Sequence, residues 1–85
     1  MIHITVTPNS IEAIGHADYD AHGKDIICSA ISILMYTLSI RGHMDKEESG
    51  HAIVVSEDKQ ALELIVEGLK LIERNYPQYV EVIEC

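Results

Sequence analysis

The stretch DIICSAISILMYTLSIRG, residues 25–42, decides the fold because it is the longest largely apolar segment of the chain. Asp25 can accept a hydrogen bond from a first-turn backbone N–H, as N-cap residues do, and Gly42 is a stop signal. We therefore expect a helix from Asp25 to about Arg41. Nearly every side of this helix is apolar, which indicates that it is covered on both sides, in so small a protein by another subunit. Its narrow polar seam consists of Ser29, Ser32, Tyr36 and Ser39.

A hairpin is predicted before this helix. Residues 2–7 (IHITVT) alternate between apolar and polar side chains, which is the pattern of a half-buried strand. Residues 8–10 (PNS) favour a turn, and residues 11–17 return as a second strand. The following loop, residues 18–24, contains Gly23, which offers a flexible hinge.

The second half of the chain predicts two further strands and a second helix. Residues 41–50 (RGHMDKEESG) are rich in charge and predict a connector, whereas residues 51–56 form an apolar run typical of a central strand buried on both faces. Ser56 can cap the second helix, Pro77 ends it, and residues 79–84 close the chain as a strand. The core stripe expected on this helix is Leu62, Ile65, Leu69, Ile72 and Tyr76.

The predicted order is β-β-α-β-α-β within a single domain, residues 1–85. Two helices on one face of a four-stranded sheet bury the apolar side of every element, so we predict an α+β fold built as a two-layer sandwich. The pattern does not predict the order of the strands.

Composition excludes several classes of function. A net charge of −8 repels nucleic-acid backbones, so we expect no direct contact with nucleic acid. Two cysteines, one of them the terminal Cys85, are too few for a disulfide framework. The apolar stretch is shorter than the ~20 residues of a membrane span, and the N-terminus lacks the features of a signal peptide. These features predict a cytoplasmic protein without membrane contact.

The residues able to carry chemistry gather in GHADYDAHGKDIICSA, residues 15–30. If Asp25 is the N-cap, Cys28 lies in the first helical turn, where unpaired N–H groups and the helix dipole favour the thiolate and lower the pKa of a cysteine. A cysteine nucleophile needs an imidazole within reach. His16, at the end of the second strand, is the first candidate base and His22 in the loop the second. The alternative is that Cys28 packs in the core as a small hydrophobic residue.

The same stretch also raises the hypothesis of a metal site, because His16, His22 and Cys28 fall at intervals of six. Structural zinc sites usually contain closer pairs such as Cys-x2-Cys, and this sequence has none. We therefore expect neither a metal nor another cofactor. The carboxylates near these residues are Asp18, Asp20 and Asp25.

The motif GHA at residues 15–17, a loop, and GKDIICSAIS at residues 23–32 resemble the signature of the Prp family of bacterial ribosomal-processing cysteine proteases. The resemblance implies a homodimeric Cys/His endopeptidase that removes the N-terminal extension of a large-subunit ribosomal protein. His16 matches the catalytic histidine and Cys28 the nucleophile of that family. Ser29 departs from it, because members usually have alanine there. The supporting residues of the matched motif are Gly15, Gly23, Asp25 and Ser32.

Several roles stay open at this point. Asp25 either caps the helix or orients His16, and Ser32 bonds either to the active-site groups or to a carbonyl of its own helix. The loop that carries Asp18, Asp20 and His22 is expected to order on a basic N-terminal segment of the substrate. The rival to the protease is a non-enzymatic, dimeric, ribosome-associated adaptor; a metal-binding domain ranks below both.

Overall fold

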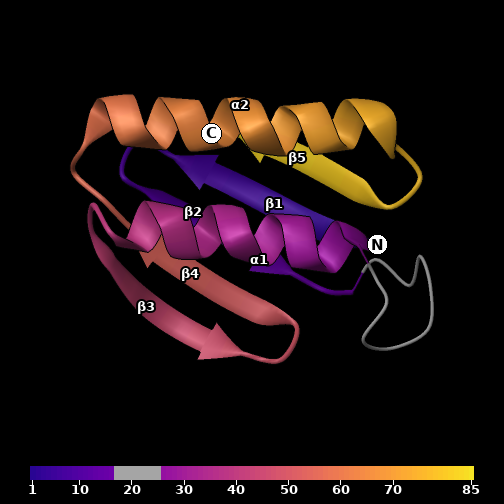
Figure 1. The fold of residues 1–85 in the computed structure, drawn as a ribbon, viewed down its shortest axis with the longest axis horizontal. Helices are drawn as coiled ribbons and strands as arrows, with labels where there is room; N and C mark the ends of the chain where they lie inside the picture. The colour runs from indigo at the N-terminus through magenta and orange to yellow at the C-terminus, as the bar shows by residue number, and fades with distance from the viewer. Residues whose placement is uncertain (17–25) are drawn as a thin grey trace.

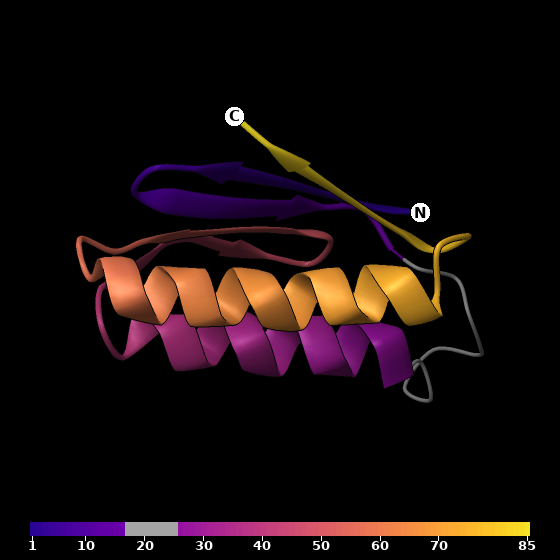
Figure 2. The same ribbon diagram turned by 90° about the horizontal axis from the view of Figure 1, so that it is seen from above.

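The computed structural model describes residues 1–16 and 26–85, which form two layers, a sheet and a pair of helices (Figures 1 and 2). Both helices lie side by side on one face of the sheet (Figure 2). The predicted two-layer α+β sandwich is confirmed, with five strands in the sheet in place of the expected four. The elements are β1 (Ile2–Thr7), β2 (Ser10–Ile14), α1 (Ile26–Ser39), β3 (His43–Glu48), β4 (His51–Val55), α2 (Lys59–Asn75) and β5 (Val80–Glu84).

The sheet has the strand order β3-β4-β2-β1-β5. Every neighbouring pair is antiparallel except β1 and β5, which run parallel. The expected first hairpin is present, with Thr7 opposite Ser10 and His3 opposite Ile14. Alternation along β1 is also as predicted, because Ile2, Ile4 and Val6 are buried. They face the helices, since successive strand residues point to opposite faces of a sheet.

The fifth strand, β3, corrects the prediction of a connector at residues 41–50. It forms a hairpin with β4 and occupies one edge of the sheet. Its sequence HMDKEE contains one apolar residue, and none of its side chains is fully buried. Charged residues on an edge strand discourage pairing with another chain, and here they remove the apolar alternation by which a strand is recognised.

The strand β4 is less enclosed than its apolar sequence predicted. Only Val54 is buried, and the other four residues are half-buried. The helices cover one face of the sheet (Figure 2), and no second layer of the described residues covers the other face. Ile53 points to that other face, because it alternates with the buried Val54. The prediction of burial on both faces was therefore wrong.

The two helices pack through stripes at helical spacing. In α1 the buried residues are Ile27, Ile31, Met35 and Leu38. In α2 the predicted stripe is confirmed, with Leu62, Ile65 and Leu69 buried and its last two members half-buried against the same core. Neither helix in the described ranges is long and apolar enough to span a bilayer.

The cap of α2 is Asp58, not Ser56 as predicted. The Asp58 Oδ1 atom accepts a hydrogen bond from the Ala61 N–H at 3.0 Å. Ser56 is instead buried between elements: its hydroxyl donates to the Arg41 carbonyl at 2.7 Å and accepts from the Asp58 N–H at 3.1 Å. Its hydroxyl thus joins the segment after α1 to the start of α2. The expected cap of α1, Asp25, lies outside the described residues.

Candidate active site

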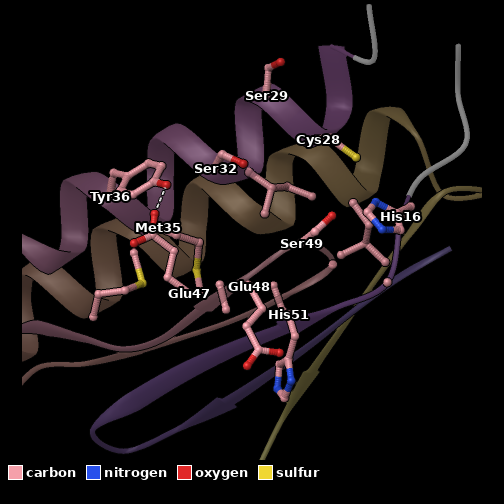
Figure 3. A pocket seen from close by; sticks show the side chains of 17 residues that line it. His16, Cys28, Ser29, Ser32, Met35, Tyr36, Glu47, Glu48, Ser49 and His51 are labelled. Atoms are coloured by element: carbon pink, nitrogen blue, oxygen red, sulfur yellow. Dashed lines mark hydrogen bonds between the residues drawn. The ribbon is translucent and has the colours of Figure 1, made fainter. Parts of the chain in front are cut away.

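A groove of about 610 Å³ runs between α1 and the end of the sheet formed by β2, β3 and β4 (Figure 3). Three of the four residues in the polar seam of α1, Ser29, Ser32 and Tyr36, line it. Most of the polar seam of α1 therefore borders this groove, with the Ser29 hydroxyl pointing away from it (Figure 3). The apolar residues that line the groove include Ile31, Met35, Met44 and Ala52.

Cys28 lines one end of the groove from the first turn of α1. It is the third residue of a helix that begins at Ile26, and its sulfur projects into the groove (Figure 3). The side chain is half-buried against the core and forms no disulfide. The first turn of α1 carries no acidic residue. The positive end of a helix dipole lies at its first turn and favours negative charge nearby.

His16 reaches the same end of the groove from the end of β2. The preceding residue, Gly15, has a φ of +106°, and its N–H donates to the Gly50 carbonyl at 2.8 Å. A Cβ atom at Gly15 would collide with the carbonyl oxygen of Met1. The backbone therefore leaves the strand in a conformation that favours glycine, and this turn directs His16 toward the groove.

Gly50, in the turn between β3 and β4, lies against the His16 imidazole. Its φ is +79°, and an added Cβ would lie 2.7 Å from the His16 Nε2 atom. The ring thus packs directly against the backbone of this turn. The contact between Gly50 and His16 was not predicted, because residues 41–50 were expected to form a connector and not a hairpin. The Ser-Gly pair at residues 49–50 is a turn signal that could have predicted the hairpin.

The structure brings together the predicted residues Gly15, His16, Cys28 and Ser32, which all line one groove. In Figure 3 the sulfur and the imidazole enter it from opposite walls, and Ser32 lies one helical turn beyond Cys28. A thiol and an imidazole that line one groove are the two side-chain groups that cysteine catalysis uses. The other predicted site residues, Asp18, Asp20, His22, Gly23 and Asp25, lie outside the described residues.

The opposite end of the groove is built from side chains. The Tyr36 hydroxyl, from α1, donates a hydrogen bond to the Glu47 carboxylate of β3 (Figure 3). This bond, together with the negative charge of Glu47, raises the pKa of Tyr36 above its usual value of 10.0. Tyr36 is therefore a neutral phenol at physiological pH. Tyr36 was expected in the polar seam of the helix, and its partner Glu47 was not predicted.

Metal ligands do not gather in the described part of the chain. Within residues 1–16 and 26–85, no group of three or more His, Cys, Asp and Glu side chains is placed to hold a metal ion. Of the three spaced ligands in the metal hypothesis, His16 and Cys28 are described and His22 is not.

Comparisons with known proteins agree on one family. The family model described as "Cysteine protease Prp" matches residues 1–81. The ribosomal processing cysteine protease Prp of Mycoplasma pneumoniae is 27% identical over 97 aligned positions, which cover 94% of this chain and 91% of that protein.

Solved structures share the fold. The essential ribosomal processing protease Prp from S. aureus, in complex with a covalently linked product peptide, matches with a TM-score of 0.86 and 22% identity over all of both chains. The same protease in complex with a substrate peptide matches with a TM-score of 0.79 and 21% identity, again over all of both chains.

Proposed function

The chain belongs to the Prp family of cysteine proteases, and we propose that it removes the N-terminal extension of a bacterial large-subunit ribosomal protein, with Cys28 as nucleophile and His16 as general base. The observation that carries these two roles is that both side chains line one groove, Cys28 from a helix N-terminus and His16 from a strand end. The names of the relatives, which are ribosomal processing proteases, support the substrate class. Membership of a protease family argues against the non-enzymatic adaptor.

In the proposed reaction, His16 takes the proton of the Cys28 thiol while the sulfur attacks the scissile carbonyl carbon. The oxyanion of the tetrahedral intermediate faces backbone N–H groups in the first turn of α1. As the C–N bond breaks, His16 gives its proton to the leaving amine and an acyl-thioester on Cys28 remains. Water, deprotonated by His16, then hydrolyses this thioester and restores the thiol.

Charge supports a basic substrate. The chain carries 14 acidic against 6 basic residues, so its field attracts a cationic peptide tail over long range. We propose that Asp18 and Asp20 contribute to this attraction from the loop that joins base to nucleophile, and that His22 belongs to the same substrate loop. Localisation in the cytoplasm, and the absence of direct nucleic-acid and membrane contacts, stay predictions from composition.

We also propose a homodimer, with the outer surface of the helices as its interface. Ile26 and Ile33 of α1, and Ile40 directly after its last residue, recur every seven residues, which places them on one side of the helix. All three are more than half exposed. Leu64 and Leu71 of α2 are also exposed and seven residues apart. An apolar surface of this kind is typical of a protein contact.

The decisive experiment incubates the protein with its organism's N-terminally extended large-subunit ribosomal proteins. We expect one of them to be shortened at its N-terminus by the native protein, whereas Cys28→Ala and His16→Ala each lower the rate by at least about a thousandfold. Cys85→Ala is the matched control, because it removes the other, exposed cysteine, and should cleave normally. Undiminished cleavage by Cys28→Ala would exclude Cys28 as the nucleophile, and cleavage of none of these proteins would exclude the substrate class.

A further inference from the structure

The end of the groove remote from Cys28 owes its shape to an irregularity in β3. Opposite β4, the register shifts between Met44, which faces Val54, and Lys46, which faces Ile53. Asp45 is therefore an extra residue, and the strand contains a β-bulge. Bulges re-aim the side chains that follow them and are frequent next to active sites.

The bulge turns Glu47 toward the helices. Glu47 lies opposite Ala52 and Met44 opposite Val54, and Val54 is buried beneath the helices. Residues 44 and 47 of a regular strand would point to opposite faces, so without the extra residue Glu47 would leave the groove. In the structure both Met44 and Glu47 line it.

Among the residues that the structure describes, no cation forms an ion pair with Glu47. Its Oε2 atom accepts the Tyr36 hydroxyl. The nearest basic residue along the strand, Lys46, pairs instead with Glu48 at 3.9 Å. The raised pKa of Tyr36 keeps the phenol protonated. The Glu47 carboxylate, with its Oε2 atom bonded to Tyr36, thus lies at the end of the groove, which Met35 and Met44 also line.

We propose that Tyr36, Glu47 and the neighbouring methionines form a specificity subsite for a lysine or arginine side chain of the peptide substrate, an inference that rests on the proposed function. The aliphatic stem lies along Met35 and Met44, as the stems of long cations do on apolar surfaces. The head group binds the Glu47 carboxylate and lies near the Tyr36 ring, which favours cations over its face.

The geometry also sets where in the substrate this cation stands. Cys28 and Tyr36 are eight residues apart on α1, which corresponds to about 12 Å along the helix axis. An extended peptide advances about 3.3 Å per residue. The cation therefore lies about three or four residues from the cleaved bond, on one side of it.

The test uses synthetic peptides that share the junction cleaved in the ribosomal substrate. A single lysine is moved from five residues before the bond to five residues after it, and glutamine replaces every other basic residue in that range. We expect kcat/KM to be at least about fivefold higher with lysine at the third or fourth position on one side than with glutamine there. Glu47→Gln should bring this ratio to about one.

Glu48→Gln is the matched control, because it removes the neighbouring carboxylate, which lies opposite His51 in the β3–β4 pair. This variant should keep the lysine preference. In the native protein the preference should also fall as salt is added, since the contact is partly exposed. A lysine preference that survives in Glu47→Gln, or cleavage by the native protein without any preference, overturns the subsite.

Measurements of peptide binding distinguish the lysine subsite from the proposed protease activity. Cys28→Ala cannot turn over substrate by the proposed route, so its affinity for the same peptides is measured by fluorescence anisotropy. Tighter binding of the lysine peptide that is lost in Cys28→Ala/Glu47→Gln supports the subsite even if the native protein cleaves no peptide. Cleavage that depends on Cys28, with equal binding of lysine and glutamine peptides, leaves the protease and removes the subsite.

Discussion

The two ends of the groove are held in place by different means. At the Cys28 end, His16 is oriented by backbone: two glycines with positive φ and an N–H···O bond of 2.8 Å between them. At the other end, Tyr36 and Glu47 meet through one exposed side-chain hydrogen bond. A contact with the backbone leaves a ring less freedom than a contact with a flexible side chain, and the proposed proton transfer depends on a well-placed imidazole. An exposed side-chain pair adapts to its ligand, which suffices for recognition.

The largest effect is expected from Gly15→Ala, which tests whether the backbone constrains the Cys28 end of the groove. A φ of +106° is strained for alanine, and its Cβ would collide with the Met1 carbonyl. We expect a loss of about 2–4 kcal/mol in the free energy of unfolding, and hence a Tm lower by at least about 10 °C. Thermal unfolding followed by circular dichroism measures this effect. An unchanged Tm would show that the β2 exit is not constrained by its backbone.

Gly50→Ala should have the next largest effect, and its effect should fall mainly on kcat. Its Cβ would lie 2.7 Å from the His16 Nε2 atom, so the imidazole must move. Under the proposed mechanism, a displaced imidazole costs about tenfold to a hundredfold in kcat, while KM changes little. Steady-state kinetics on the ribosomal substrate separates the two parameters.

Two further variants isolate the cause of that loss. Gly50→Asn tolerates a positive φ better than alanine but still carries a Cβ, so it should lose kcat with less loss of stability. Gly68→Ala, in the middle of α2 against Leu34, should leave kcat unchanged. If Gly50→Asn kept full kcat, the contact with His16 would have no role in catalysis.

Asp58→Ala, outside the groove, separates a general loss of stability from a displacement of His16. It removes the N-cap bond to the Ala61 N–H, which should cost about 1 kcal/mol of folding free energy and lower the Tm by roughly 4–8 °C. Below its own Tm this variant should retain the kcat of the native protein. A fall in kcat comparable to that of Gly50→Ala would mean that general loss of stability, not the position of His16, limits the rate.

The smallest expected effect is at the Tyr36–Glu47 end. The hydrogen bond to Glu47 and its negative charge raise the pKa of Tyr36, so Glu47→Gln should lower that pKa toward its ordinary value. Because the pKa is raised in the folded state, the bond stabilises the fold below the unfolded pKa of 10.0 and is lost as pH rises through the folded value. The tyrosinate absorbance, corrected with Tyr36→Phe, follows this titration. An identical Tyr36 titration in both proteins would contradict the contact.

The parts of the site that sequence could predict are those that depend on local pattern. The position of Cys28 follows from a helix start, and that of His16 from the end of an alternating strand, so both were within reach of the sequence. The roles of Gly50 and Glu47 could not be predicted from the sequence, because they arise from pairing with β4 and from contact with residues distant in the chain. The cap of α2 was misplaced for the same reason, since Ser56 bonds to Arg41 in another segment.

By itself, the sequence determined two amphipathic or apolar helices, a first hairpin, a closing strand and a cysteine in the first turn of a helix. These features depend on side-chain periodicity and capping, which act over a few residues. Only the tertiary structure decided that a charged segment becomes the edge strand β3, that its turn supports His16 and that its bulge directs Glu47 into the groove. Such outcomes depend on which strands pair and in what register. A strand without an apolar face lacks the alternating pattern from which its pairing and register could be predicted.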